Sequence, residues 1–322
     1  MEIAETLHPM SERAACRACG SKRIEDLGAC APFPESVAQI GGRVMPVGRL
    51  LRCLECGLGQ RHPCMNSDEL AEIYRDSPAD AMDYPPEQNM AWHEVGRNLR
   101  RLHADSAKIS VLDIGCHTGL FLASLPEAWK RFGIEGAIAP AEVATTKHHV
   151  TIVADALETT TAEWHGYFDV VTLFDVLEHL PDPSDGLLRA SRLLKPNGVL
   201  MVSTGDMDSW TWLWSRGNHW YLQAPLHISF CSRKFFAFAA RRQNLLLQAM
   251  TRISHTRGTA QERVHQVVNT LYWGMRERGS WWRWPRRLLA LFPGSKDLPH
   301  LEAIPWSMKL RDHAIAVFTK RA

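Results

Sequence analysis

Short apolar runs recur along the middle of the chain, and polar, helical patterns lie between them. The runs occupy residues 111–114, 132–135, 150–155, 168–175 and 199–203, and two later runs occupy 245–253 and 314–319. Strand-length apolar runs that alternate with helical segments are typical of a parallel sheet covered by helices on both faces. We therefore predict an α/β fold with a doubly wound, mostly parallel seven-stranded sheet.

The segments outside these runs suggest further divisions of the chain. Residues 67–97 contain two polar helical patterns around a proline-rich break, which we assign as a helical linker. Residues 98–322 then form the main domain, with an insertion at about 254–311 before the last strand. Residues 1–66 stand apart, because they contain six of the eight cysteines.

Composition limits the possible classes of protein. The chain has 322 residues, of which 45% are hydrophobic and 22% charged, so a large buried core is expected and general disorder is excluded. No run approaches the roughly 18 apolar residues of a membrane span, and the N-terminus lacks the apolar core of a secretory signal. We expect a cytoplasmic protein whose thiols remain reduced.

Two Cys-x-x-Cys pairs, each followed by glycine, dominate the N-terminal region. Two such pairs can supply a complete tetrahedral thiolate shell for structural Zn(II), whereas redox chemistry and unpaired core cysteines are the alternatives. The predicted zinc-ribbon ligands are Cys16, Cys19, Cys53 and Cys56. Spare candidates are Cys30, Cys64 and His62, and the isolated Cys116 and Cys231 are expected to be small core residues.

A glycine-rich turn follows the first apolar run of the main domain. The residues from Gly115 to Gly119 connect this run to an apolar helix start, a geometry that brings backbone N–H groups close to a ligand. Glu135 ends the second run 22 residues after Asp113, the spacing at which a carboxylate meets ribose hydroxyls in nucleotide-binding folds. A nicotinamide-binding unit is the competing interpretation, but the turn lacks the G-x-G-x-x-G that it normally requires.

The motifs LDIGCHTG, FGIE, ADALE, FDVVTLFDVLEHLPDP and LLKPNGVLMVST, in this order, resemble the class I S-adenosylmethionine (SAM)-dependent methyltransferases over residues 98–242. The resemblance implies SAM as the cofactor, with the turn at its methionine end and acidic strand ends at its ribose and adenine. His117 departs from the pattern, since the family usually has glycine there. The implied cofactor-binding residues are Asp113, Gly115, His117, Gly119, Glu135, Asp155, Ala156, Phe174 and Asp175.

Two histidines are candidates for the general base. His179 follows the fourth strand, and with Asp175 and Glu178 it also resembles the E-x-x-E-H metal site of some quinone-pathway O-methyltransferases. His227 lies in a loop, 217–230, that resembles the acceptor loop of the polysaccharide- and deoxysugar-cluster methyltransferases, a branch that often carries a zinc ribbon. Each histidine is otherwise a hydrogen-bonded structural residue. The sugar C-methyltransferases have glutamate where this chain has Leu226, which favours O-methylation.

Charge is distributed unevenly along the chain. The formal net charge is only +2, yet residues 231–322 contain 17 Lys and Arg against 5 Asp and Glu. Arginines and tryptophans gather at 267–293, where a helical lid, a peripheral membrane contact and a nucleic-acid patch are the three interpretations. Trp210, Trp212 and Trp214 alternate, as in a strand or a packed lid. The basic region favours a phosphate- or lipid-linked acceptor.

The sequence leaves three other functions open. An RNA methyltransferase would use the ribbon to grip RNA, but residues 1–230 are acidic overall and no Asn/Asp-Pro-Pro-Tyr motif follows the fourth strand. A sugar C-methyltransferase and a non-catalytic SAM-binding protein are the others. We expect O-methylation of a sugar, glycan or other small biosynthetic intermediate.

Overall fold

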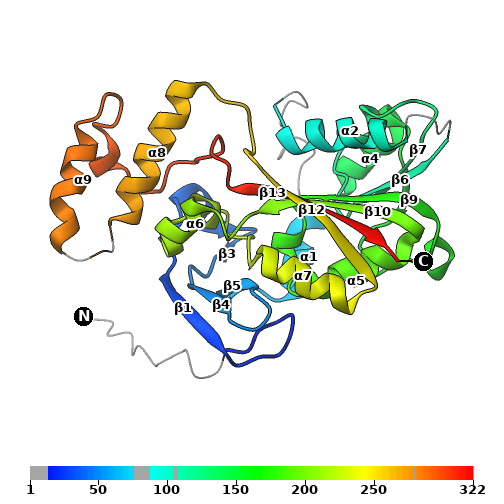
Figure 1. Cartoon of the computed structure of the whole chain (residues 1–322), viewed down its shortest axis with the longest axis horizontal. Coiled ribbons are helices and arrows are strands. Elements are labelled where there is room, and N and C mark those ends of the chain that lie inside the picture. Colours follow the sequence, from blue (N-terminus) through cyan, green and yellow to red (C-terminus); the bar gives the residue numbers. More distant parts are fainter. Residues whose placement is uncertain (1–13, 76–87, 104–107, 277, 279, 322) are drawn as a thin grey trace.

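A seven-stranded sheet forms the centre of the molecule (Figure 1). The computed structural model describes residues 14–75, 88–103, 108–276, 278 and 280–321. The strand order is β12-β13-β10-β9-β6-β7-β8, and only β13 runs against the others. The strands are β6 (Ser110–Ile114), β7 (Lys130–Ile134), β8 (Thr151–Ala154), β9 (Phe168–Phe174), β10 (Leu194–Gly205), β12 (Leu245–Ile253) and β13 (His313–Lys320). The predicted α/β sheet is confirmed.

Both faces of this sheet are buried, as the unbroken apolar runs require. Alternate residues of a strand point to opposite faces, so Leu112 and Leu173 belong to one core cluster whereas Val111 and Val170 belong to another. Helices cover both faces (Figure 1). They are α2 (Met90–Leu102), α3 (Leu120–Ala123), α4 (Ile138–His148), α5 (Pro183–Leu193) and α7 (Arg233–Arg242).

A second sheet joins the N-terminal region to the main domain. Its order is β1-β4-β5-β11, with antiparallel pairing throughout. These strands are β1 (Ile24–Ala29), β4 (Arg49–Cys53), β5 (Gly59–His62) and β11 (Ser229–Phe230), and a separate hairpin pairs β2 (Gln39–Ile40) with β3 (Arg43–Val44). Because β11 belongs to the predicted acceptor loop, the cysteine-bearing region and that loop form one structure.

Several predicted details differ from the structure. The expected boundary between residues 97 and 98 lies inside α2, and the expected linker includes α1 (Ser67–Arg75), although residues 76–87 lie outside the described part of the chain. The strand β10 begins earlier than the apolar run at 199–203, and residues 196–198 form an irregularity within it, at which the pairing register with β9 shifts. The strand interpretation of Trp210–Trp214 is wrong, because these residues form most of the helix α6 (Trp210–Ser215).

The insertion before the last strand is helical. It contains α8 (Ala260–Gly274) and α9 (Arg283–Ala290), and Figure 1 shows both at the end of the molecule away from the main sheet. Thr259 and Glu262 form a capping box at the start of α8. Trp273 of α8 packs with Trp212 and Trp220 in a third core cluster. Within the described ranges, no helix is both long enough and apolar enough to cross a bilayer.

Candidate functional site

The glycine-rich turn has the strained geometry that its sequence predicts. Gly115 and Gly119 have φ of 70° and 78°, and His117, at the position expected to be glycine, has φ of 47°. All three lie in the left-handed region, which is costly for a residue with a Cβ. A Cβ on Gly119 would lie 2.8 Å from Val150 Cγ2, so close packing also requires glycine there.

The acidic residues at the strand ends have different surroundings. Glu135 accepts hydrogen bonds from the backbone N–H groups of His117 (2.7 Å) and Ala137 (2.8 Å), which tie the glycine turn to the end of β7. Asp155, next to Ala156, is exposed and accepts a hydrogen bond from the Thr159 hydroxyl. These positions at the carboxyl edge of the sheet are those expected for ribose and adenine contacts.

Asp113 lies inside the sheet. Its carboxyl group is buried and accepts a hydrogen bond of 2.7 Å from the Thr172 hydroxyl. Burial raises its pKa to about 8, with Glu135 adding to the shift and the Thr172 hydrogen bond opposing it. The side chain therefore links β6 to β9 inside the sheet.

Phe174 and Asp175 lie where β9 ends. The Phe174 ring packs edge-on against Phe121, 4.5 Å between centroids, just after the glycine turn. Asp175 has φ of 53°, an uncommon conformation for a residue with a side chain, and its backbone N–H donates to the carbonyl of Ser203. This sharp turn directs the chain into the short helical segment that contains His179.

Both predicted base candidates lie in one cluster. Ligating atoms of Glu178, His179 and His227 all lie within 4.8 Å of one another, and the two imidazole rings are 4.8 Å apart. Glu178 is fully buried and accepts hydrogen bonds from the hydroxyls of Tyr221 and Thr204. Burial, reinforced by Asp175, raises the pKa of Glu178 to about 8. The acceptor loop and the end of β9 thus meet at this point.

The two histidines have different hydrogen-bond partners. His227 Nδ1 lies 2.9 Å from the carbonyl oxygen of Tyr221, so this nitrogen carries the proton and Nε2 carries the lone pair. His179 Nδ1 contacts both the Tyr74 hydroxyl and the Leu226 carbonyl oxygen. Burial lowers the pKa of His179 to about 4 and that of His227 well below its usual value. Both imidazoles are therefore neutral near pH 7.

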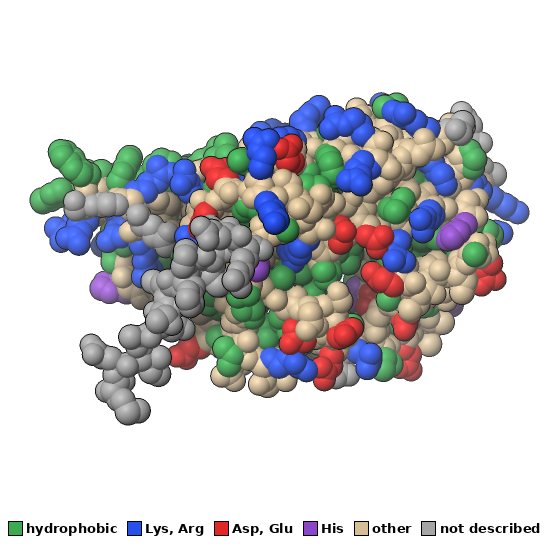
Figure 2. Space-filling model, turned by 90° about the horizontal axis from the view of Figure 1, so that it is seen from below, with side chains coloured by type: hydrophobic (Ala, Val, Ile, Leu, Met, Phe, Trp, Pro, Cys, Tyr) green, Lys and Arg blue, Asp and Glu red, His purple; other side chains and the backbone are tan. Residues whose placement is uncertain are grey.

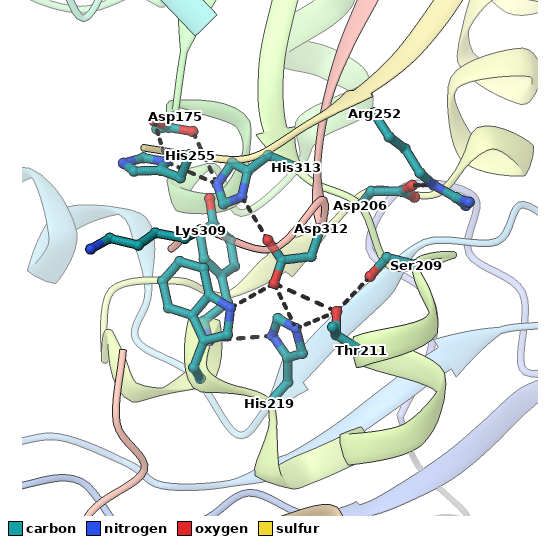
Figure 3. Close-up of polar contacts among 12 residues, drawn as sticks. Asp175, Asp206, Ser209, Thr211, His219, Arg252, His255, Lys309, Asp312 and His313 are labelled. Atoms are coloured by element: carbon teal, nitrogen blue, oxygen red, sulfur yellow. Dashed lines mark hydrogen bonds and ion pairs between the residues drawn. The ribbon is translucent and has the colours of Figure 1, made fainter. Parts of the chain in front are cut away.

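A second polar cluster was missed by the sequence analysis (Figure 3). Asp175 faces His255 and His313, with oxygen–nitrogen distances of 3.7 Å to each, and His313 also faces Asp312 at 3.6 Å. Asp312 in turn accepts a hydrogen bond of 2.7 Å from the Trp220 indole. Asp175 is thus grouped with these histidines, whereas its predicted metal partners Glu178 and His179 are grouped with His227.

Burial and charge within this second cluster shift two pKa values in opposite directions. Burial alone would lower the pKa of His313, but the adjacent Asp312 carboxylate and the other nearby carboxylates raise it. Burial lowers the pKa of His255 to about 4, although Asp175 opposes this shift. No sequence signal marked this cluster, because His313 lies at the carboxyl edge of the parallel strands only through the reversed direction of β13.

The four N-terminal cysteines converge as predicted. Their sulfur atoms all lie within 4.8 Å of one another, with 3.4 Å between Cys16 and Cys56 and 3.6 Å between Cys19 and Cys53. Tetrahedral coordination at a Zn–S distance of about 2.3 Å would give edges of about 3.8 Å. The donor set and spacing therefore fit a zinc ion. Cys116 and Cys231 are buried core residues, as expected.

Arginines connect this N-terminal region to the acceptor loop. Arg61, only 1% exposed, donates to the carbonyl oxygens of His227 (3.1 Å), Leu222 (2.7 Å) and Val47 (2.7 Å). Arg17 donates to Ile228 and Ser229 in the same loop. The backbone that positions His227 is therefore held by residues of the cysteine-bearing region.

Comparisons with known proteins agree with this arrangement. A family model described as "Methyltransferase domain" matches residues 87–249. The chain is similar to ubiquinone biosynthesis O-methyltransferases from Proteus mirabilis (34% identity, 32% of this chain and 44% of the relative) and Xanthomonas oryzae pv. oryzae (37%, 38% and 54%). It spans about half the length of these curated relatives.

Solved structures show more distant similarity. The YcgJ protein from Bacillus subtilis is 15% identical, with a TM-score of 0.47 over 71% of this chain and 99% of that one. Phosphoethanolamine N-methyltransferase 2 from Haemonchus contortus, solved with SAM, is 14% identical, with a TM-score of 0.46 over 73% and 54%. Because the family model spans just over half of the 322 residues, the chain belongs to the methyltransferase domain family.

Proposed function

We propose that this methyltransferase transfers the methyl group of SAM to a hydroxyl oxygen of a sugar, glycan or other small biosynthetic intermediate, with His227 as the general base. The observation that carries the proposal is the tautomer of a half-buried, neutral His227 beside the end of β9, set by its contact with the Tyr221 carbonyl. The similarity to O-methyltransferases supports transfer to oxygen.

The chemistry required of the protein is modest. SAM supplies the methyl group and a sulfur leaving group, so the chain must orient the acceptor and remove its proton. The hydroxyl oxygen bonds to the methyl carbon while the carbon–sulfur bond breaks and its electron pair stays on sulfur. The hydroxyl proton passes to Nε2 of His227, whose Nδ1–H stays on the Tyr221 carbonyl.

His179 is proposed as a positioning residue. Its Nδ1 contacts Tyr74 and Leu226, so this ring anchors the residue just before His227. The edge-on contact of the two imidazoles then fixes the direction in which His227 points.

Buried polar groups around the acceptor loop favour a polyhydroxyl acceptor such as a sugar. Tyr221 packs against His227 with ring centroids 4.1 Å apart, and Trp220 lies against His313. Both aromatic rings are only 3% exposed, so they hold the histidines in place, and the polar groups beside them suit the hydroxyls of a sugar. The basic C-terminal third, with 17 Lys and Arg, favours an acceptor linked to phosphate.

We also propose that Cys16, Cys19, Cys53 and Cys56 bind a structural Zn(II). Four thiolates leave no open position for catalysis, so the ion would stabilise the ribbon fold alone. The N-terminal ribbon would then act on the reaction through the arginines that hold the acceptor loop and through the pairing of β5 with β11.

Mass spectrometry of extract fractions incubated with deuterated-methyl SAM tests the acceptor assignment. We expect the label on an oxygen of a sugar-containing metabolite. Label on a carbon atom, on RNA, or on no molecule would overturn the proposal.

Substitution of His227 tests its proposed role as the general base. His227→Ala should bind S-adenosylhomocysteine as the unsubstituted chain does, but should lose about 10²–10⁴-fold in turnover. The matched control is His165→Gln, which changes an exposed histidine and should leave turnover unchanged. Full activity of His227→Ala would show that another group accepts the proton.

A further inference from the structure

We propose that Asp175, His255 and His313 form a binding site for a divalent transition metal, separate from the cysteine site. The three residues come from three different strand ends: Asp175 follows β9, His255 follows β12 and His313 begins β13. Because β13 runs against its neighbours, its first residue meets the last residues of the parallel strands. His313 pairs with Gly205 on one side and Ile253 on the other.

The ligand atoms already have the separations of a coordination shell. His255 Nδ1 and His313 Nε2 are 3.3 Å apart, and Asp175 places Oδ2 at 3.7 Å from the His255 nitrogen and Oδ1 at 3.7 Å from the His313 nitrogen. A tetrahedral ion with bonds of about 2.1 Å requires edges of about 3.4 Å. Small side-chain adjustments would therefore suffice to close a two-histidine, one-carboxylate site.

The surroundings of His313 are those of a metal ligand. Its other ring nitrogen, Nδ1, faces the Asp312 carboxylate at 3.6 Å, and Trp220 and Tyr221 hold the ring from two sides. A carboxylate behind a ligating imidazole fixes its orientation and increases its basicity. Figure 3 shows this order of residues, with His313 between Asp175 and Asp312.

Asp175 is unusually constrained for a residue at a strand end. Its φ is 53°, and its Oδ1 is buried without a hydrogen-bond partner among the described residues. An unsatisfied buried carboxylate oxygen is costly unless a ligand completes it. A cation bound between Asp175 and the two imidazoles would satisfy this oxygen and account for the strained turn.

The site is also open to a small ligand. The side chains of Asp175 and His255 are 25% and 11% exposed to solvent, whereas that of His313 is buried. Three protein ligands leave one or more positions for water or a substrate oxygen. Resting on the proposed function, we infer that an acceptor oxygen occupies this position, where the metal would promote loss of the hydroxyl proton.

Metal counting tests the site without relying on activity. The purified chain is equilibrated with Co(II) or Zn(II) alone, and bound metal is measured by elemental analysis. We expect His255→Gln and Asp175→Asn to bind one ion fewer per chain than the unsubstituted protein. The control His165→Gln should bind the same number.

The cysteine site is distinguished by its spectrum. Thiolate ligands give Co(II) sulfur-to-metal charge-transfer bands, which Cys16→Ser/Cys53→Ser should lose while keeping the bands of the nitrogen–oxygen site. Circular dichroism confirms that each variant is folded. Equal metal content in the unsubstituted chain and His255→Gln would overturn this inference. Failure of methyl transfer to oxygen would overturn the proposed function and the placement of an acceptor oxygen on the ion, but not the metal site.

A second inference concerns α9 and the turn before it, whose exposed side chains fit an anionic lipid bilayer. Trp281, Trp284, Leu288 and Leu291 are 91%, 72%, 66% and 74% exposed. Their spacing of three, four and three residues places them on one face of a helix. We infer that this stripe inserts at the surface of a bilayer, at the level of the lipid headgroups.

Charge and packing support this orientation. Leu289 and Phe292 pack toward the third core cluster, so the exposed stripe faces away from the body. Residues 280–293 contain three arginines and no acidic residue, and Arg287 lies 5.6 Å from the Trp284 ring centre. Figure 2 shows hydrophobic and basic side chains together at the end of the molecule that carries α9. Arginine beside tryptophan complements lipid phosphate.

Vesicle sedimentation tests the surface. The chain should bind vesicles of phosphatidylglycerol and phosphatidylcholine, and bind pure phosphatidylcholine vesicles far more weakly. Arg283→Gln/Arg287→Gln should weaken binding about thirtyfold, and Trp284→Ser/Leu288→Ser at least as much. Val44→Ser changes a side chain that is 75% exposed elsewhere and is the matched control. Equal binding by these variants, or binding to RNA but not to vesicles, would overturn this inference.

Discussion

The buried guanidinium of Arg61 donates a hydrogen bond of 3.1 Å to the backbone carbonyl of His227. Arg61 belongs to β5 of the cysteine-bearing region, and His227 is the proposed base in the acceptor loop. The same guanidinium also holds Leu222 and Val47. A single side chain thus connects the N-terminal ribbon to the position of a proposed catalytic group.

Replacement of this arginine should affect both stability and turnover. Arg61→Met leaves three buried carbonyl oxygens without their donor, so we expect the free energy of unfolding to fall by about 3 kcal/mol or more. We expect turnover to fall by a larger factor than the affinity for SAM, and calorimetry measures that affinity. Arg23→Met removes only an exposed ion pair with Glu55 and should cost less than about 1 kcal/mol. Equal effects of the two variants would contradict the connection.

Loss of zinc should reduce turnover from a distance. Cys16→Ser/Cys53→Ser should remove the ion and loosen β4 and β5, and with them Arg61, while the glycine turn retains its affinity for SAM. Elemental analysis measures the metal, and labelled-methyl transfer measures turnover. Unchanged zinc content would exclude the ribbon assignment, and full turnover after verified zinc loss would exclude the coupling.

The pH dependence of catalysis should reflect the buried environment of His227. A general base must be unprotonated, so kcat/KM rises with pH through the pKa of the free enzyme. Burial lowers the pKa of His227 below the usual 6.5, and the neighbouring His179 adds to the shift. We expect the acid limb of the profile below pH 6.5. An acid limb at or above that value would require a different base.

Glu178 should make the folded chain less stable as the pH rises. Burial raises its pKa from 4.5 to about 8, so between these values the folded chain holds a proton that the unfolded chain has released. The stabilising contribution is complete below pH 4.5 and is lost by about pH 8. Glu178→Gln should reduce this slope in urea unfolding curves. Some dependence of stability on pH should remain in this variant, because the pKa of Asp113 is also raised. An unchanged slope would refute the assignment.

Glu135 should control both the shape of the glycine turn and cofactor affinity. Glu135→Ala removes the acceptor for the N–H groups of His117 and Ala137, besides any contact to ribose. We expect SAM affinity to weaken about tenfold to a hundredfold by calorimetry. Glu142→Ala, an exposed change on α4, is the control and should have no effect. Unchanged affinity of Glu135→Ala would remove Glu135 from the binding site.

The sequence predicted what depends on local pattern. The strands were found because each is a short, fully buried run, and the cysteine cluster because two paired motifs need only converge. Tryptophan at every second position suggested a strand at Trp210–Trp214. The segment is a helix instead, with Trp212 on its buried face.

Relationships across long separations could not be predicted. β11 has two residues, too few for any alternation to reveal its pairing with β5. Arg61 resembles a surface arginine until the three carbonyl oxygens around it are known. His255 and His313 lie beside Asp175 only because β13 reverses direction, and the direction of a strand is a property of the whole sheet.

The sharing of one sheet by β5 and β11 affects the order of events during synthesis. The three N-terminal strands leave the ribosome about 170 residues before their fourth partner, at a distance that makes their final pairing slow. Until Phe230 is made, the edge of β5 has no partner strand from the acceptor loop. The proposed zinc ion, if captured early, would hold the cysteine knuckles of the nascent chain while the remaining residues are translated.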